Sequence, residues 1–212
     1  MIIYGATMSP FVRKVLAFAA EKRVDVESIQ IGLGSTDPDF LAASPFRKIP
    51  ALRDGDFTLA DSSAIVHYIE ALHPDPALIP TDAKARAKAI WYDEFADTIL
   101  VAAAGKMFFN RVVAPVFLKR PGDLAAADKA EAEELPPVLA YIERMLPASG
   151  HLVEDRLTLA DIAVTSPFAN LMHAGYSVDA AVYPKVAAFA AAILGRPSFA
   201  GMVARETKAL RG

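Results

Sequence analysis

The feature that most constrains this chain is the dipeptide Ile49-Pro50, which stands directly before the short apolar run Ala51-Leu52. Proline has no backbone N–H, so it is confined to the start of a strand, to a sheet edge or to a turn. A cis X-Pro peptide is kept in folded proteins only where the fold requires it. If this peptide is cis, the amide and carbonyl of Ile49 are left to face a ligand.

A helix start follows after a short hairpin. Asp61-Ser62-Ser63 precedes apolar residues at helical spacing, which is the pattern of a capped helix. An acidic side chain and the free amides of a helix N-terminus would then lie beside the proline, where they could hold an ammonium and a carboxylate, the two ends of an amino acid. Each motif alone is more typical of structure than of function, but their order and spacing carry more information.

The first third of the chain predicts a small α/β unit. Residues 1–4 form a strand, Ser9-Pro10 starts a helix that runs to Glu21, and residues 24–31 form a second strand, which together indicate a parallel crossover. Arg13 and Lys14 are expected on a solvated face of that helix. A short helical segment around 40–43 leads to the hairpin.

Two short runs flank Asp54-Gly55-Asp56 and predict an antiparallel hairpin. The capped helix then runs from about Ser62 to Leu72, so that the order is βαβ followed by ββα. Three prolines between residues 73 and 80 break any helix and indicate a linker.

Beyond the linker the pattern is helical throughout. Thr158 and Asp161 resemble a capping box, and Pro136-Pro137 is expected to kink or divide its helix. The predicted helices cover 83–113, ended by Pro115, then 124–146, 158–172, 184–194 and 197 to about 210. We therefore predict an α/β domain over 1–75, a linker over 76–81 and an all-α domain over 82–212.

Composition excludes several functions. The absence of cysteine removes disulfides, thiolate metal ligands and a cysteine nucleophile, and is compatible with a reducing compartment. With 22 basic and 25 acidic residues, nucleic acid and anionic membranes are not expected as main partners. No leader pattern or run of ~20 apolar residues stands out, so a cytoplasmic protein is expected. The four histidines are scattered without ligand spacing, and no metal site is expected.

Four motifs in order resemble those of the glutathione S-transferase family. They are Ser9-Pro10-Phe11-Val12-Arg13-Lys14, Lys48-Ile49-Pro50-Ala51-Leu52, Asp61-Ser62-Ser63-Ala64-Ile65 and Leu157-Thr158-Leu159-Ala160-Asp161-Ile162-Ala163. The resemblance runs essentially from end to end. It implies a thioredoxin-like domain followed by a helical domain, a cytosolic homodimer, and glutathione as co-substrate with a small electrophile as second substrate.

The resemblance also assigns glutathione-binding roles. Ile49 beside Pro50 would pair its backbone with the cysteinyl part of glutathione, and Asp61 and Ser62 would take the γ-glutamyl ammonium and carboxylate. Lys48 lies near where the family often meets the glycyl carboxylate, and Arg47 could share that work. The remaining positions assigned to glutathione binding are Ser9 and Phe11.

This chain departs from the family pattern in two places. The family frequently has Asn-Pro-x-Gly before its X-Pro dipeptide, whereas Ser44-Pro45-Phe46-Arg47 stands here, and Asp61 replaces the more usual glutamate. The lost glycine and the shorter acidic side chain affect the exact contacts with glutathione, but the kinds of group that would bind it stay the same.

The catalytic task is to ionise the thiol, which with an ordinary pKa of about 8.5 is only ~3% thiolate at neutral pH. Ser9 fits this task, because as N-cap its oxygen can accept from a backbone amide while its O–H donates to the sulfur. Thr7 is the rival, since serine-type members can carry the hydroxyl slightly earlier in this loop, and Tyr4 is a weaker one. The resemblance places Ser9 where omega-like members have cysteine, so thiol transfer through a protein thiol is excluded.

The second substrate is expected to be electrophilic and largely apolar. Six aromatic residues could line its pocket, although an aromatic stripe at helical spacing is more typical of a core: Phe11, Trp91, Tyr92, Phe95, Phe108 and Phe109. Two other functions stay open. One is glutathione-dependent isomerisation of a maleyl-type acid, disfavoured by the missing Ser-Ser-Cys run of that class, and the other is a related binding protein that catalyses little.

Overall fold

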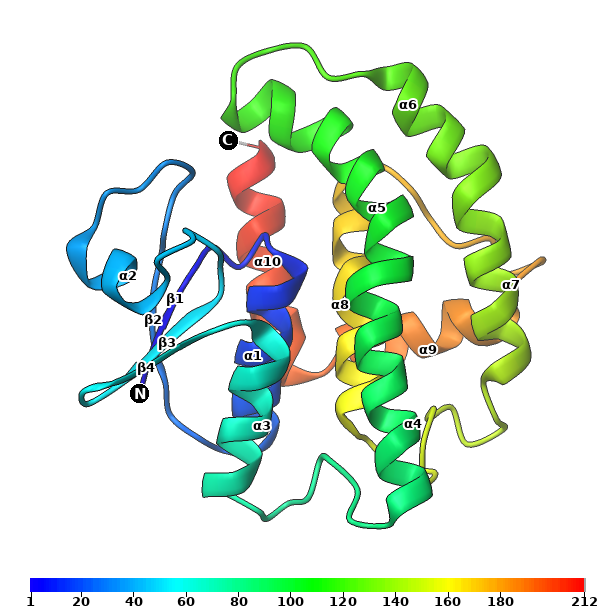
Figure 1. The fold of residues 1–212 in the computed structure, drawn as a ribbon. Coiled ribbons are helices and arrows are strands. Elements are labelled where there is room, and N and C mark those ends of the chain that lie inside the picture. The colour runs from blue at the N-terminus through cyan, green and yellow to red at the C-terminus, as the bar shows by residue number, and fades with distance from the viewer. Residues whose placement is uncertain (212) are drawn as a thin grey trace.

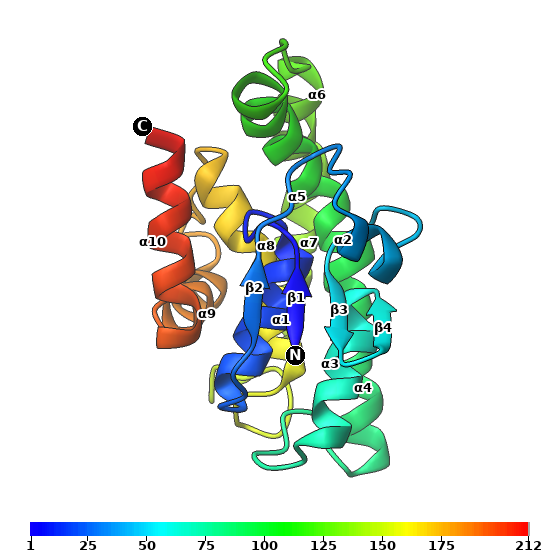
Figure 2. The same ribbon diagram turned by 90° about the vertical axis from the view of Figure 1, so that its left-hand side faces the viewer.

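Four short strands form one mixed sheet in the order β2-β1-β3-β4 (Figure 2). In the computed structural model, which describes residues 1–211, β1 (Ile2–Tyr4) runs parallel to β2 (Glu27–Ile29) and antiparallel to β3 (Ala51–Asp54). Strand β3 pairs with β4 (Phe57–Ala60) as the predicted hairpin. Strand β2 covers three residues of the predicted 24–31, and β1 lacks the first of its four predicted residues.

Helices cover both faces of this sheet. Ile3 and Leu52 point into the core made with α1 (Pro10–Glu21) and α3 (Ser62–Leu72). Tyr4 and Ala51 point to the opposite face and pack with residues of α2 (Pro38–Ala43). The period of two in a strand thus divides neighbouring residues between two apolar cores.

The rest of the chain is helical, and the fold is the α/β plus all-α arrangement that the sequence predicts (Figure 1). The longest helix runs over Ala83–Phe117 and packs against α8 (Leu159–His173), with which it forms the centre of the helical domain. Its successive parts are α4 (Ala83–Glu94), η1 (Phe95–Leu100), α5 (Val101–Phe108) and η2 (Phe109–Phe117). The other helices are α6 (Leu124–Lys129), η3 (Ala130–Glu134), α7 (Leu135–Met145), α9 (Pro184–Leu194) and α10 (Pro197–Arg211). The exact domain limits, 1–75 and 82–212, stay predictions.

Proline does not end the long helix where the sequence indicated. Pro115 lies inside η2, one of three segments with π-helical geometry, and the helix continues to Phe117. A π-helical turn shifts the hydrogen-bond register, so the missing N–H of a proline is tolerated there. Pro136 and Pro137 instead occupy the first turn of α7, directly after η3, so that a π-helical segment joins α6 to α7.

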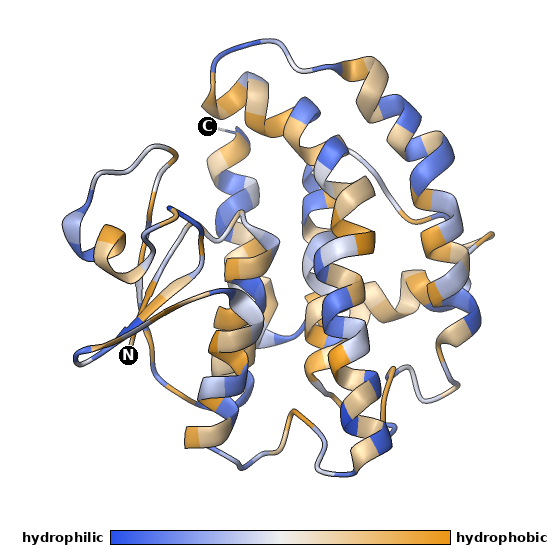
Figure 3. Ribbon diagram, viewed as in Figure 1, coloured by the Kyte–Doolittle hydropathy of each residue, from blue (hydrophilic) through white to orange (hydrophobic). Residues whose placement is uncertain are grey.

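The long helix is apolar enough to cross a membrane by length and composition, and it is the one helix among residues 1–211 that passes this test alone. Helices α9 and α10 pass it only when taken together across a 90° bend. In this fold the long helix is a core helix, with Leu100, Ala104 and Met107 buried among its neighbours. Figure 3 shows hydrophilic stretches interrupting its apolar ones.

The cations of α1 are buried, contrary to the expected solvated face. Arg13 and Lys14 are 0% and 1% exposed, because α8 and α10 cover the side of α1 that faces away from the sheet (Figure 1). Arg13 pairs with Glu206 at 2.7 Å, and Lys14 pairs with Asp93 at 2.6 Å. Partners more than 75 residues away in the chain therefore make the burial of these charges possible.

Gly122 allows the chain after η2 to approach Asn110 closely. A Cβ at position 122 would overlap the carbonyl of Asn110 and lie 2.8 Å from its Cα. We expect Gly122→Ala to lower the free energy of unfolding by about 1 to 3 kcal/mol, as overpacking does. Gly105 in α5 is the matched control, because a Cβ there meets only Val101 at 3.6 Å and Gly105→Ala should stabilise by up to ~1 kcal/mol. Urea unfolding of both variants measures the difference, and equal effects would contradict the close approach.

Candidate active site

Ser9 begins α1 as predicted, but its hydroxyl does not cap the helix. Its backbone has the extended conformation of an N-cap, with φ −74° and ψ 127°, and Pro10 follows at the first helical position. The side chain makes no capping hydrogen bond, so the expected acceptor role within the cap is wrong. The whole hydroxyl, donor and acceptor, is left for other partners.

The Ser9 side chain lines a cavity of about 480 Å³ between the two domains. Ile49 and Arg47 of the sheet domain line the same cavity, and the helical domain contributes three apolar residues from the end of α5 and from η2, namely Phe108, Val113 and Phe117. The rest of the wall comes from the loop after β1 and from residues 31–40: Ala6, Met8, Pro10, Ile31, Gly32, Leu33, Gly34, Ser35 and Phe40. The loops after β1 and β2, the loop before β3 and the end of the long helix thus meet around Ser9.

The peptide bond between Ile49 and Pro50 is cis, as the first motif suggested. Among residues 1–211 the Ile49 N–H donates to no turn, loop or cap acceptor. Ser44 shapes the loop before it, because its hydroxyl accepts from the Lys48 N–H at 2.8 Å and donates to the Lys48 carbonyl at 2.7 Å. Arg47 adopts φ +56°, the left-handed conformation that the family's usual glycine would take freely. Arg47 therefore keeps the backbone conformation typical of glycine although glycine is absent from this position.

Asp61 caps α3 and links it to the cis-proline. Its carboxylate accepts from the Ala64 N–H at 2.9 Å, and its own N–H donates to the Pro50 carbonyl at 3.4 Å. Its φ of +106° is strained for a non-glycine residue. The amides of Ser62 and Ser63 at the start of α3 have no intrahelical acceptor, which leaves them and the helix dipole for an anion.

A buried charge cluster lies directly behind Ser62. The Ser62 hydroxyl donates to Asp97 at 3.2 Å, and Lys14 Nζ donates to Asp97 and Asp93, each at 2.6 Å. Burial raises the pKa of the Asp97 carboxyl although Lys14 opposes the shift. Two acids face one lysine here, so the cluster favours a further cation. Asp97 comes from η1 of the helical domain, and no local sequence pattern announced it.

Both rivals of Ser9 face away from the cavity. Thr7 lines a separate cleft beside α10, together with Glu206. The pKa of Glu206 lies below its ordinary value: burial raises it, but the hydrogen bonds with His173 and Arg13 and the charge of Arg13 outweigh burial. Tyr4 is 1% exposed against α2, and burial raises the pKa of its phenol, so it is poorly placed to act on a bound ligand.

Of the six candidate aromatic residues, the cavity wall includes Phe108 alone. Trp91, Tyr92 and Phe95 instead form a cluster with Tyr141 of α7, where the rings of Phe95 and Tyr141 are 5.2 Å apart and Trp91 Nε1 donates to the Tyr141 hydroxyl at 3.3 Å. Phe11, Lys48, Pro50, Asp61 and Ser62 also lie outside the wall of this cavity, although Pro50 and Asp61 adjoin Ile49.

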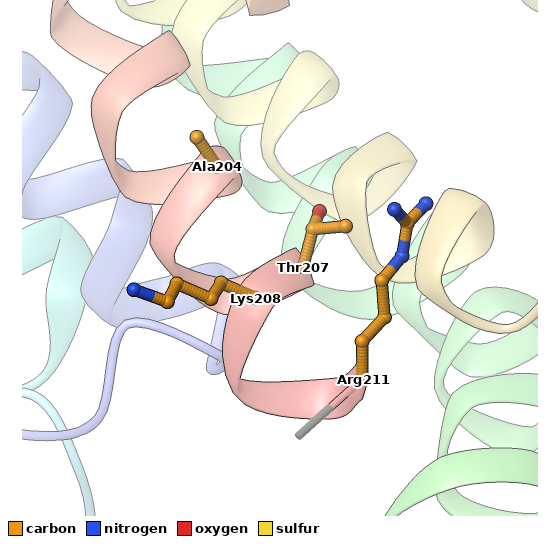
Figure 4. A pocket seen from close by; sticks show the side chains of 4 residues that line it. All are labelled: Ala204, Thr207, Lys208 and Arg211. Carbon is orange, nitrogen blue, oxygen red and sulfur yellow. The ribbon is translucent and has the colours of Figure 1, made fainter.

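A second hollow lies on the outside of α10, far from this chemistry. Ala204, Thr207, Lys208 and Arg211 line a shallow depression, in which the two basic side chains point in different directions (Figure 4). No acidic side chain or histidine that could act as a base is among its lining residues, and the Thr207 hydroxyl donates to the Val203 carbonyl of its own helix at 2.9 Å, so this depression does not compete with the Ser9 cavity as an active site.

The fold and this cavity define a two-domain protein of the thioredoxin-like class, with its candidate site between the domains. Residues 3–77 match the family model of the glutathione S-transferase N-terminal domain, and residues 108–204 match that of the C-terminal domain. The chain belongs to the glutathione S-transferase family. It is 35% identical over 208 residues to glutathione S-transferase 3 of Zea mays, with 95% of this chain and 92% of the relative covered.

Two further comparisons agree with this assignment. The chain is 31% identical over 204 residues to a glutathione S-transferase of Hyoscyamus muticus, covering 94% of this chain and 95% of the relative. The solved structure of glutathione S-transferase-I bound with lactoylglutathione is similar with a TM-score of 0.84 at 28% identity, covering 96% of this chain and 98% of that one. The family, fold and domain order inferred from the four motifs are confirmed.

Proposed function

We propose that this protein is a glutathione transferase that ionises the thiol of glutathione and adds the sulfur to an electrophilic, largely apolar small molecule. The observation that carries the proposal is the Ser9 hydroxyl, which is not used as a helix cap and shares a cavity with Ile49 beside the cis-proline. The glutathione S-transferase relatives support the same activity.

Glutathione would extend from Ser9, past Ile49, to the start of α3. The Ile49 backbone would pair with its cysteinyl part, and the amides at the start of α3 would hold the γ-glutamyl carboxylate. Asp61 would hold the γ-glutamyl ammonium, and the excess negative charge of Asp93 and Asp97 around Lys14 favours a cation nearby. Lys48, which is exposed, and Arg47, which lines the cavity, are available for the glycyl carboxylate.

Ser9 would activate the thiol by donating its hydroxyl proton in a hydrogen bond to the sulfur. Hydrogen bonds to a charged acceptor contribute about 1.5 to 3 kcal/mol, which corresponds to roughly one to two units of pKa. The N-terminus of α1 adds a favourable dipole. Thr7 stays the rival candidate, but its place beside Glu206 argues against it.

The second substrate would lie against Met8, Phe108, Val113 and Phe117. Arg47 is the only charged residue in the cavity wall among the described residues. An apolar wall next to a thiolate favours an uncharged electrophile, which partitions into the cavity before the carbon–sulfur bond forms.

We also propose a cytoplasmic homodimer. Phe46, in the loop before the cis-proline, is 87% exposed, the highest value among the large apolar side chains of the described residues, and an interface between two chains would bury it. We expect the wild type to sediment at twice the mass of one chain, and Phe46→Asp to shift it toward the monomer, because a charge in an apolar interface is left unpaired. Phe109→Asp, at a residue that is 40% exposed beside Arg120, is the control. A dimer that survives Phe46→Asp would place the interface elsewhere.

The proposed activity is tested by titrating the thiolate absorbance of glutathione bound to the wild type. We expect a bound thiol pKa well below the free value of about 8.5, together with turnover of an apolar electrophile. If glutathione binds with an unshifted pKa and no electrophile is turned over, the protein is a binding protein of this fold and the catalytic proposal is wrong.

A further inference from the structure

The turn that carries Ser9 is held from the helical domain at two backbone carbonyls. Asn170 Nδ2 donates to the Met8 carbonyl at 2.8 Å, and Ser166 Oγ donates to the Pro10 carbonyl at 2.9 Å. Both donors belong to α8 and are 2% and 1% exposed. The residues on either side of Ser9 are therefore fixed by side chains more than 150 positions further along the chain.

Arg13 fixes the orientation of the Asn170 amide. Arg13 Nη1 donates to Asn170 Oδ1 at 2.9 Å and to the Ser166 carbonyl at 2.7 Å. Because a guanidinium has no acceptor, the amide oxygen must face Arg13, and the amide nitrogen is left to face Met8. Glu206 in turn holds Arg13 through two hydrogen bonds of 2.7 and 3.3 Å, and the Nε2 atom of His173 lies 3.0 Å from the same carboxylate.

The backbone of Ser9 is also held locally, because its N–H donates to the Ala6 carbonyl at 2.9 Å and its carbonyl accepts from the Arg13 N–H at 3.0 Å. The two side-chain anchors matter because they fix this turn relative to the helical domain, which forms the other wall of the cavity. The Ser9 side chain has no capping partner, so the position of the hydroxyl follows from the backbone of the turn alone. Catalytic contacts are sensitive to displacements of about 1 Å, and a charge-assisted hydrogen bond requires a short distance.

We propose that Asn170, together with Ser166, is a positioning residue for Ser9. It acts through the Met8 carbonyl, and Arg13 and Glu206 keep its amide in the required orientation. This inference rests on the proposed function, in which the Ser9 hydroxyl donates to the thiolate of glutathione.

Two variants test the proposal. Asn170→Asp keeps the oxygen that faces Arg13 and the shape of the side chain, but removes the donor to Met8. Ser166→Ala removes the donor to Pro10 without adding a charge. In each variant we expect the pKa of the bound thiol to rise by about one unit and kcat near neutral pH to fall up to about tenfold. The KM for glutathione should change less than about twofold, because Ile49 and the start of α3 are untouched.

Arg196→Gln is the matched control. Arg196 makes an ion pair with Glu21 at 2.7 Å, also between the domains but away from the Ser9 turn. We expect this variant to lower the melting temperature while leaving the bound thiol pKa unchanged. If the bound thiol pKa rises in Asn170→Asp alone, the new charge is the cause. If it rises in all three variants, the cause is a general loss of packing between the domains. Either result overturns the proposal, as would a wild-type pKa in both test variants.

The same titration separates this inference from the function on which it rests. If wild-type protein does not lower the thiol pKa, the proposed function fails. If it does, and Asn170→Asp and Ser166→Ala behave like wild type, only the positioning role fails. Hydrogen exchange of residues 6–12 provides a second readout, since loss of either anchor should speed exchange in this turn but Arg196→Gln should not.

Discussion

Replacing Ser9 with alanine is expected to raise the pKa of bound glutathione toward that of the free thiol and to reduce turnover most strongly at low pH. If Ser9 supplies about two units of pKa, the thiolate fraction at about pH 6.5 falls from roughly one half to about 1%. At about pH 9.5 both proteins hold mostly thiolate, so the ratio of wild-type to variant kcat/KM should shrink about 50-fold across this range. The higher intrinsic nucleophilicity of a more basic thiolate scales the ratio equally at every pH.

The pH dependence separates ionisation from other causes of lost activity. A variant that merely binds glutathione in the wrong place would lose the same factor at every pH. Thr7→Ala is the matched control, since it removes a hydroxyl from the same loop that lies beside α10, and its pH–rate profile should stay that of wild type. If Thr7→Ala shows the shifted profile and Ser9→Ala does not, the activating hydroxyl has been assigned to the wrong residue.

The largest loss of stability is expected from Glu206→Gln. Arg13 is 0% exposed and Glu206 is 2% exposed, so removing the negative charge leaves a buried guanidinium without its counter-charge. We expect the free energy of unfolding to fall by roughly 3 kcal/mol, at the lower end of the range for breaking a buried pair, because glutamine can still accept one hydrogen bond. Urea unfolding near neutral pH measures the loss.

An exposed ion pair provides the control for this charge removal. Lys106 and Glu134 are 2.7 Å apart but are 51% and 33% exposed, and solvent screening limits the effect of Glu134→Gln to less than about 1 kcal/mol. A similar loss in both variants would show that burial of the Arg13 pair contributes nothing extra.

The same pair predicts how stability depends on pH. The pKa of Glu206 is lowered in the folded protein, so its contribution is fully present above the unfolded value and is lost as pH falls through the folded value. The difference in stability between wild type and Glu206→Gln should therefore shrink on acidification. A difference that grows in acid would contradict the lowered pKa.

The fold could be predicted from the sequence wherever the signals were local. Ser9-Pro10, the Asp54-Gly55-Asp56 turn and the Thr158–Asp161 capping box each act within a few residues, and the elements that they begin or join are present. The predicted end of the long helix at residue 113 is too early. The prediction assumes that a proline ends an α-helix, whereas the π-helical register around Pro115 accommodates it.

The candidate site was predictable only in part, for the same reason. The cis-proline and the Asp61 cap are local features, and the structure brings them together. Asp97 lies in η1, and Val113 and Phe117 lie in η2, so their positions depend on two π-helical segments of the long helix, which no short pattern encodes. Arg13 and Lys14 are indistinguishable from surface charges until their distant partners are known.

The cations of α1 also bear on how this chain is made. Lys22 finds Glu70 soon after the first domain is complete, but Lys14 needs Asp93, and Arg13 needs Glu206, which lies 193 residues further along. During synthesis, the residues of the first domain therefore leave the ribosome before the acidic partners of Arg13 and Lys14 have been made. The domain that is synthesised first can complete the Arg13 pair only when Glu206, close to the end of the chain, has emerged, and in the meantime α1 has to be kept from incorrect partners.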